Sequence, residues 1–124
     1  MTEQRPLSVL VVDDDEDIRE VLSEILHARG YAVQTAPEGR EALALLRAGA
    51  PPSLILLDMR MPGMNGWEFC HEQRRDPRLA GIPVVVLSGG SRRGVANSIG
   101  AADVLAKPID LEELTSKIER HAKR

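Results

Sequence analysis

The 124-residue chain has few aromatic side chains and only one cysteine. Because Tyr31, Trp67 and Phe69 are the only aromatics, the hydrophobic core has to be built from aliphatic residues. Cys70 has no second cysteine to pair with, which excludes an internal disulfide and a cysteine metal cluster. We therefore expect a reduced, cytoplasmic protein.

Two classes of partner are disfavoured by what the sequence lacks. A net charge of -3 gives none of the basic footprint that nucleic-acid-binding domains carry, so we expect no nucleic-acid partner. No apolar stretch approaches the length of a membrane span, and residues 1–6 do not have the form of a signal peptide. We therefore expect no membrane partner either.

The chain does contain short aliphatic runs that alternate with helical patterns. Runs of this kind, bounded by turn residues, are typical of buried parallel strands. Strands are predicted over residues 9–12, 31–35, 54–57, 82–87 and 104–106. Helical patterns lie between them and after the last one, including residues 15–29 and a final helix capped by Asp110. This alternation predicts an α/β fold, a doubly wound five-stranded parallel sheet with five helices on its two faces.

The fourth of these helices should be short, because residues 93–99 offer only Val95 and Ile99 as an apolar pair. The length fits one domain, residues 1–124 with a core over about 7–122. The pattern ends with the fifth helix, so we expect no output domain.

Five polar residues stand where four of the aliphatic runs stop. They are Asp13, Asp14, Asp58, Ser88 and Lys107. In an open α/β sheet the carboxyl ends of the strands line one crevice, where ligands bind. We therefore expect three carboxylates, a hydroxyl and an ammonium to meet in one pocket.

The chemistry of such a pocket favours a metal ion and a phosphoryl group. Two carboxylates about 5 Å apart repel by roughly 3 kcal/mol at an effective dielectric constant of about 20, and one lysine cannot balance three of them. Oxygen ligands suit Mg²⁺ (or Mn²⁺), which usually works beside a phosphate. A carboxylate can itself accept a phosphoryl group. Taken singly, acids after a strand often only cap the next helix, but an unpaired carboxylate such as Asp58 after a buried run is costly.

Four segments extend this reading to a family. They are LVVDDDEDIREVL, LILLDMRMPGMNGWE, PVVVLSGG and GAADVLAKPIDLEEL, in this order along nearly the whole chain. They resemble the signature blocks of response-regulator receiver domains, the phospho-accepting half of two-component signalling. The resemblance implies a flavodoxin-like strand order of 2-1-3-4-5.

The resemblance also implies a role for each acid. Asp58 would be the phosphorylation site, and it would also ligate the metal. Asp14 would be a direct metal ligand, whereas Asp13 would act through metal-bound water. The backbone carbonyl of Arg60 would complete the protein ligands.

Two further positions would read the phosphoryl group, and one departs from the family pattern. Ser88 would move onto the phosphoryl group, Lys107 would pair with it, and the Lys107–Pro108 peptide bond would be cis. Receiver domains often carry an aromatic switch residue where this chain has Val104. We expect the output mechanism to be unconventional for this reason.

The leading hypothesis is a stand-alone receiver that takes a phosphoryl group from a sensor histidine kinase or a histidine phosphotransfer protein. It would signal by protein–protein contact with a downstream protein and would not be an enzyme beyond Mg²⁺-dependent self-phosphorylation and autodephosphorylation. A degenerate, phosphorylation-independent interaction module is the alternative, favoured mildly by Val104. An aspartate-nucleophile phosphatase is a third hypothesis, but its usual second aspartate is replaced by Arg60. Trp67 and Cys70 are interpreted as packing residues of the third helix.

Overall fold

The structure, a computed structural model, describes residues 6–61, 63–89 and 100–123. Its five strands form one parallel sheet in the order β2-β1-β3-β4-β5. The strands are β1 (Ser8–Val12), β2 (Ala32–Ala36), β3 (Leu54–Asp58), β4 (Val84–Ser88) and β5 (Asp103–Ala106). The predicted α/β class, the five parallel strands and their order are thereby confirmed.

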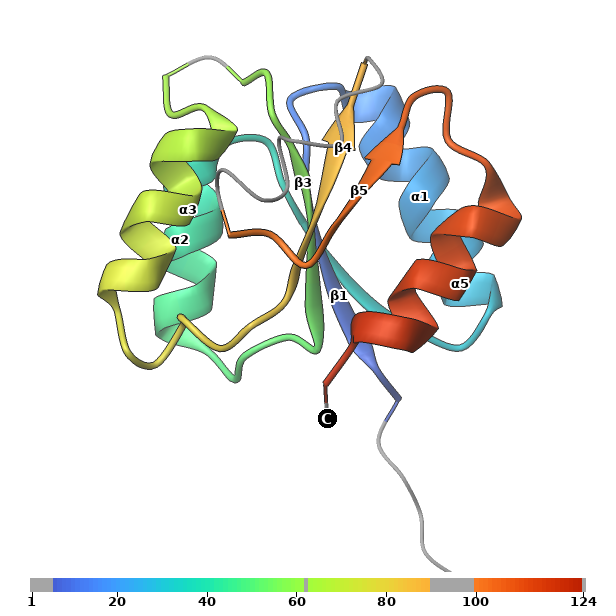
Figure 1. Cartoon of the computed structure of the whole chain (residues 1–124). Coiled ribbons are helices and arrows are strands. Elements are labelled where there is room, and N and C mark those ends of the chain that lie inside the picture. The colour runs from blue at the N-terminus through green and yellow to red at the C-terminus, as the bar shows by residue number, and fades with distance from the viewer. Residues whose placement is uncertain (1–5, 62, 90–99, 124) are drawn as a thin grey trace, which may run out of the picture.

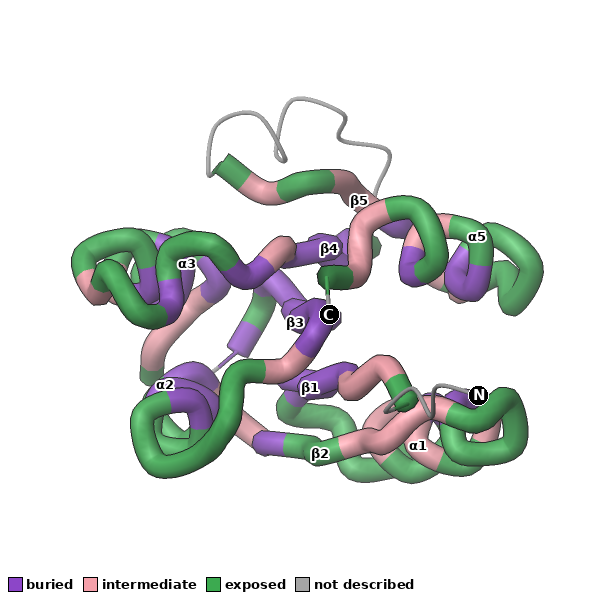
Figure 2. Tube along the Cα trace, turned by 90° about the horizontal axis from the view of Figure 1, so that it is seen from below, coloured by how far each residue is buried: buried purple, intermediate pink, exposed green. Residues whose placement is uncertain are grey.

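The described residues contain four helices, two on each face of the sheet. They are α1 (Glu16–Ala28), α2 (Gly39–Ala48), α3 (Gly66–Arg75) and α5 (Leu111–His121). Helices α2 and α3 cover one face and α1 and α5 the other (Figures 1 and 2). The short fourth helix predicted over 93–99 lies outside the described residues. None of the four described helices combines the length and the apolar character that crossing a bilayer requires.

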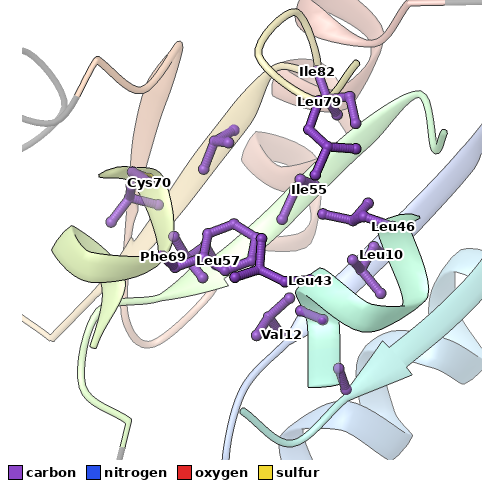
Figure 3. Packing of buried hydrophobic residues seen from close by; sticks show 14 of the residues in the cluster. Leu10, Val12, Leu43, Leu46, Ile55, Leu57, Phe69, Cys70, Leu79 and Ile82 are labelled. Carbon is purple, nitrogen blue, oxygen red and sulfur yellow. The ribbon is translucent and has the colours of Figure 1, made fainter. Parts of the chain in front are cut away.

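The aliphatic core is divided into two layers by the sheet. Alternate strand residues such as Leu10 and Ile55 face α2 and α3, where they pack around Phe69 (Figure 3). Their neighbours Val9 and Leu54 pack against α1 and α5. Strand β3 is buried on both faces, so all its residues are apolar except Asp58, which lies at the edge of the sheet.

Each strand differs from its predicted range by one or two residues at one end or both. Two strands, β2 and β4, start later than predicted because hydrogen bonds hold the preceding residues in turns. The N–H of Tyr31 donates to the carbonyl of Leu26, 3.0 Å away, which leaves Tyr31 in the turn after α1 and starts β2 one residue later. The carboxamide Nε2 of buried Gln73 donates to the carbonyls of Leu79 and Ile82 at 2.9 and 3.0 Å. The segment before β4 is therefore a turn, and β4 starts after it.

The beginning of α3 is fixed against the residue that follows β3. Asn65 and Glu68 form a capping box, with their side chains 2.9–3.0 Å from each other's backbone N–H groups. The N–H of Gly66 donates to the carbonyl of Met59 over 3.2 Å. A Cβ at Gly66 would lie 3.0 Å from the Cα of Met59 and would overlap its sulfur, so only glycine allows this approach.

We predict that Gly66→Ala destabilises the domain by about 1–2 kcal/mol, because the cost of overpacking against buried Met59 exceeds the gain in helix propensity of about 1 kcal/mol. Urea unfolding at neutral pH measures this free energy. Gly81→Ala is the matched control, since nothing lies within 4 Å of a Cβ built there. Equal stability of Gly66→Ala and wild type would contradict the contact.

Candidate functional site

A pocket of about 570 Å³ lies at the edge of the sheet where the strands end. All five polar residues that the sequence places at strand ends line it, namely Asp13, Asp14, Asp58, Ser88 and Lys107. In Figure 1 this is the upper edge, toward which the arrows of β4 and β5 point. The fold therefore brings together side chains that lie as far apart in the sequence as residues 13 and 107.

Asp58 is the last residue of β3 and is 6% exposed. Its Oδ1 accepts hydrogen bonds from the N–H of Arg60 and the Nζ of Lys107, both at 3.4 Å. These distances are long for hydrogen bonds, so the negative charge of the carboxylate is only weakly compensated. Among the described residues no donor is found for Oδ2.

Asp13 and Asp14 follow β1 and differ in burial. Asp13 is fully buried, and its Oδ1 accepts the backbone N–H of Asp15 at 2.9 Å. Asp14 is exposed. Carboxylate oxygens of Asp13, Asp14 and Asp58 lie within 4.8 Å of one another. Asp15 also lines the pocket, but its carboxylate caps α1, which is the simple structural role expected of an acid after a strand.

Lys107 joins the two buried carboxylates. Its Nζ lies 3.3 Å from Oδ2 of Asp13 and 3.4 Å from Oδ1 of Asp58. Its backbone N–H donates to the carbonyl of Ser88 over 2.7 Å, which fixes the chain after β5 beside the end of β4. The peptide bond between Lys107 and Pro108 is cis.

Burial acts on the pKa values of Asp58 and Lys107 in opposite directions. Desolvation and the neighbouring charge of Asp13 raise the pKa of Asp58, and the attraction of Lys107 offsets only part of this. For Lys107, burial alone would lower the pKa, but the two carboxylates together outweigh it and raise the pKa. The lysine therefore stays charged, whereas the negative charge on Asp58 is destabilised.

The site fits a divalent cation on the chemistry of its donors. Three clustered carboxylates face one ammonium, so the cluster keeps excess negative charge at neutral pH. All the clustered donors are oxygens, which hard cations such as Mg²⁺ prefer. The backbone of Arg60 lies beside Asp58 and can add a carbonyl oxygen, while its side chain is exposed.

Trp67 is a pocket residue that the sequence reasoning missed. The interpretation of Cys70 as a packing residue is confirmed, because this side chain is buried in the core. The same interpretation of Trp67 is wrong, because its side chain is 46% exposed and lines the acidic pocket. Its place in the first turn of the helix that follows Asp58 is the signal that could have indicated this.

Val104, at the position where receiver domains often carry an aromatic switch residue, lies in β5. It is half-buried and packs against the core layer beneath α2 and α3. Its carbonyl accepts a hydrogen bond from Nζ of Lys117. A valine side chain at this position cannot make the reorientation that the aromatic ring of a switch residue makes.

We predict that Asp58→Asn raises the stability of the metal-free domain at neutral pH by about 1 kcal/mol, the balance of opposing Coulomb terms of a few kcal/mol each. Because the pKa of Asp58 is higher in the folded state, the wild type gains stability as the pH falls through the range between its unfolded and folded pKa values. The advantage of the variant should therefore shrink in acid.

Urea unfolding in the presence of a chelator, at neutral and acidic pH, measures both effects. Asp17→Asn is the control, because Asp17 is an exposed aspartate outside the acidic pocket. A similar gain in stability is less favoured for Asp13→Asn, because the Asp13 carboxylate accepts hydrogen bonds from Nζ of Lys107 and from the N–H of Asp15. A clear loss of stability in Asp58→Asn would contradict the charge balance.

Comparison with known proteins gives one consistent family. The family model for the response regulator receiver domain matches residues 9–119. The chain is 38% identical over 122 residues to the response regulator MprA of Mycolicibacterium vanbaalenii, covering 96% of this chain and 52% of that protein. It is 36% identical over 119 residues to the DNA-binding dual master transcriptional regulator RpaA of Synechocystis sp., covering 94% of this chain and 49% of that protein. The chain thus spans about half the length of the curated relatives it matches.

Solved receiver structures resemble this chain over nearly the whole length of both proteins. The chemotaxis protein CheY4 of Vibrio cholerae has a TM-score of 0.86 at 33% identity, covering 94% of this chain and 98% of that one. A response regulator receiver protein from Pseudomonas putida has a TM-score of 0.86 at 31% identity, covering 96% and 99%. Together with the acidic pocket, these matches show that the chain belongs to the response regulator receiver domain family of two-component signalling.

Proposed function

We propose that this receiver domain accepts a phosphoryl group on Asp58 from a sensor histidine kinase or a histidine phosphotransfer protein. The observation that carries the proposal is the state of the Asp58 carboxylate. Oδ1 accepts hydrogen bonds from Lys107 and the backbone, whereas Oδ2 has no donor among the described residues, and Asp58 lines a pocket of about 570 Å³. A carboxylate oxygen placed in this way can act as the nucleophile.

Asp13, Asp14, Asp58 and the backbone carbonyl of Arg60 would hold Mg²⁺ or Mn²⁺ at this site. When bound, the cation would neutralise charge on the phosphoryl oxygens. Lys107 adds a positive charge 3.4 Å from Oδ1 of Asp58. The domain would act as a signalling module in the cytoplasm, with no catalytic activity beyond its own phosphorylation and dephosphorylation.

Ser88 and Lys107 would convert phosphorylation into a structural change. The hydroxyl of Ser88 lines the pocket at the end of β4, and its backbone carbonyl is joined to the N–H of Lys107. One hydrogen bond to a charged phosphoryl group contributes about 1.5–3 kcal/mol, enough for a tenfold or larger shift between two populations. The ends of β4 and β5 would move together, and a downstream protein would detect the change.

An apolar groove beside the pocket supports a protein as the phosphodonor. The groove has a volume of about 370 Å³, and it shares Ile18 and Lys107 with the acidic pocket. Its sides are formed by α1 and by the segment from Pro108 to Leu111, and Val21 and Leu111 expose 52% and 41% of their surface. A donor protein that covers this apolar surface would bring its phosphohistidine next to Asp58.

The test is incubation with Mg²⁺ and a small phosphodonor such as phosphoramidate, followed by intact mass measurement. We expect one phosphoryl adduct on the wild type and none on Asp58→Asn. Asp14→Asn should need at least tenfold more Mg²⁺ for the same rate, because it loses a metal ligand. Asp17→Asn, which alters an exposed aspartate outside the pocket, should behave as the wild type.

No adduct on the wild type, or an undiminished adduct on Asp58→Asn, would overturn the proposal. The first result would favour the phosphorylation-independent interaction module. Steady turnover of a phosphomonoester would instead favour an aspartate-nucleophile phosphatase.

A further inference from the structure

We propose that the Trp67 side chain is a shield that restricts the approach of water to the phosphorylated Asp58 and so lengthens the lifetime of the aspartyl phosphate. The inference rests on the proposed function. It assigns to Trp67 a property of the phosphorylated domain, the rate at which the signal decays.

The position of Trp67 is set by the backbone contact between α3 and the residue that follows Asp58. Gly66 donates its N–H to the carbonyl of Met59, and no Cβ fits between the two residues. The capping box of Asn65 and Glu68 fixes the first turn of the helix in addition. Trp67 is the next residue in this turn, so its Cα is held at the edge of the pocket and only its side-chain torsions remain adjustable.

The surroundings of the indole argue against a role in core packing. Trp67 belongs to neither core layer, although Phe69 and Cys70 of the same helix are both buried in one of them. It exposes 46% of its surface while lining the pocket that also holds Asp58 and Lys107. A large apolar side chain in such a place displaces water from the pocket.

A second apolar residue lines the same pocket. Ile18 lies in α1 and is half-buried. Helices α1 and α3 lie on opposite faces of the sheet (Figure 2). The pocket that holds the charged residues is thus lined by apolar side chains from two helices, Ile18 from α1 and Trp67 from α3.

The step that Trp67 would slow is hydrolysis of the acyl phosphate. A water oxygen bonds to phosphorus, the bond between phosphorus and the Asp58 oxygen breaks, and its electron pair stays on the carboxylate. The attacking water gives one of its protons to surrounding water and keeps the other, and inorganic phosphate leaves. In-line attack requires the water to come from the side opposite the Asp58 oxygen. That water has to reach phosphorus through the pocket that Trp67 lines.

The experiment measures the decay of the phosphorylated protein after removal of the donor. Wild type, Trp67→Ala, Trp67→Phe and Leu45→Ala are loaded with Mg²⁺ and phosphoramidate, and the adduct is followed by intact mass. We expect Trp67→Ala to lose its phosphoryl group about three- to tenfold faster, because more water reaches the pocket. Trp67→Phe keeps most of the apolar wall and should decay nearly as slowly as the wild type.

Leu45→Ala is the matched control, because Leu45 is a 37% exposed apolar residue on α2 that lines no part of the pocket. Its decay rate should equal that of the wild type. All four proteins should decay at one rate in denaturant, where the shield is lost. The Mg²⁺ concentration for half-maximal loading should also be the same in all four, since none of the changes removes a ligand.

Equal decay rates for Trp67→Ala and the folded wild type would overturn the inference and leave the proposed function intact. Equal acceleration in Leu45→Ala or in Trp67→Phe would overturn it too, since shielding by the indole predicts neither. The absence of an adduct on every protein would overturn the proposed function, and this inference with it.

Discussion

The site depends on one ammonium group held between two buried carboxylates. Nζ of Lys107 lies 3.3 Å from Asp13 and 3.4 Å from Asp58, and both acids are at most 6% exposed. Removing two carboxylates from water without such a partner would cost several kcal/mol for each. Lys107 thus permits the acids to be buried together, but one positive charge leaves the cluster negative. That remainder favours a cation at the site. Desolvation, together with the charge of Asp13, raises the pKa of Asp58.

The rest of the fold serves to bring these three groups to one place. Asp13 follows β1, Asp58 ends β3, and Lys107 follows β5. Because the strands are parallel and in register, their carboxyl ends reach the same edge of the sheet. The hydrogen bond from Lys107 to the carbonyl of Ser88 then joins the lysine to the neighbouring strand end. In the proposed function, a change in the charge of Asp58 would act on Lys107 and through it on the ends of β4 and β5.

The sequence alone was sufficient to predict the sheet and the place of the site. Aliphatic runs such as Leu54–Leu57 leave little choice of structure, and a polar residue at the end of a run marks the edge of the sheet. Boundaries were less certain, since Tyr31 is held by Leu26, and the turn before β4 by the distant Gln73. No local pattern reveals such hydrogen bonds.

Trp67 was misassigned for a related reason. Helical periodicity assigns apolar residues to the core, but the first turn of α3 lies at the edge of the sheet, where a residue can border the pocket instead. The loop that precedes it is anchored by the contact of Gly66 with Met59, which involves two residues separated by a turn. The short helix predicted over residues 93–99 lies outside the described residues, so it stays a prediction.

The central claim, that Lys107 only partly balances the buried acids, is tested most directly by a ¹³C NMR titration of the Asp58 carboxyl group. Without divalent cations, the account predicts a pKa above the ordinary aspartate value, a further increase in Lys107→Ala, and a decrease when Mg²⁺ is added. A pKa at or below the ordinary value in the metal-free wild type, unchanged in Lys107→Ala, would contradict it.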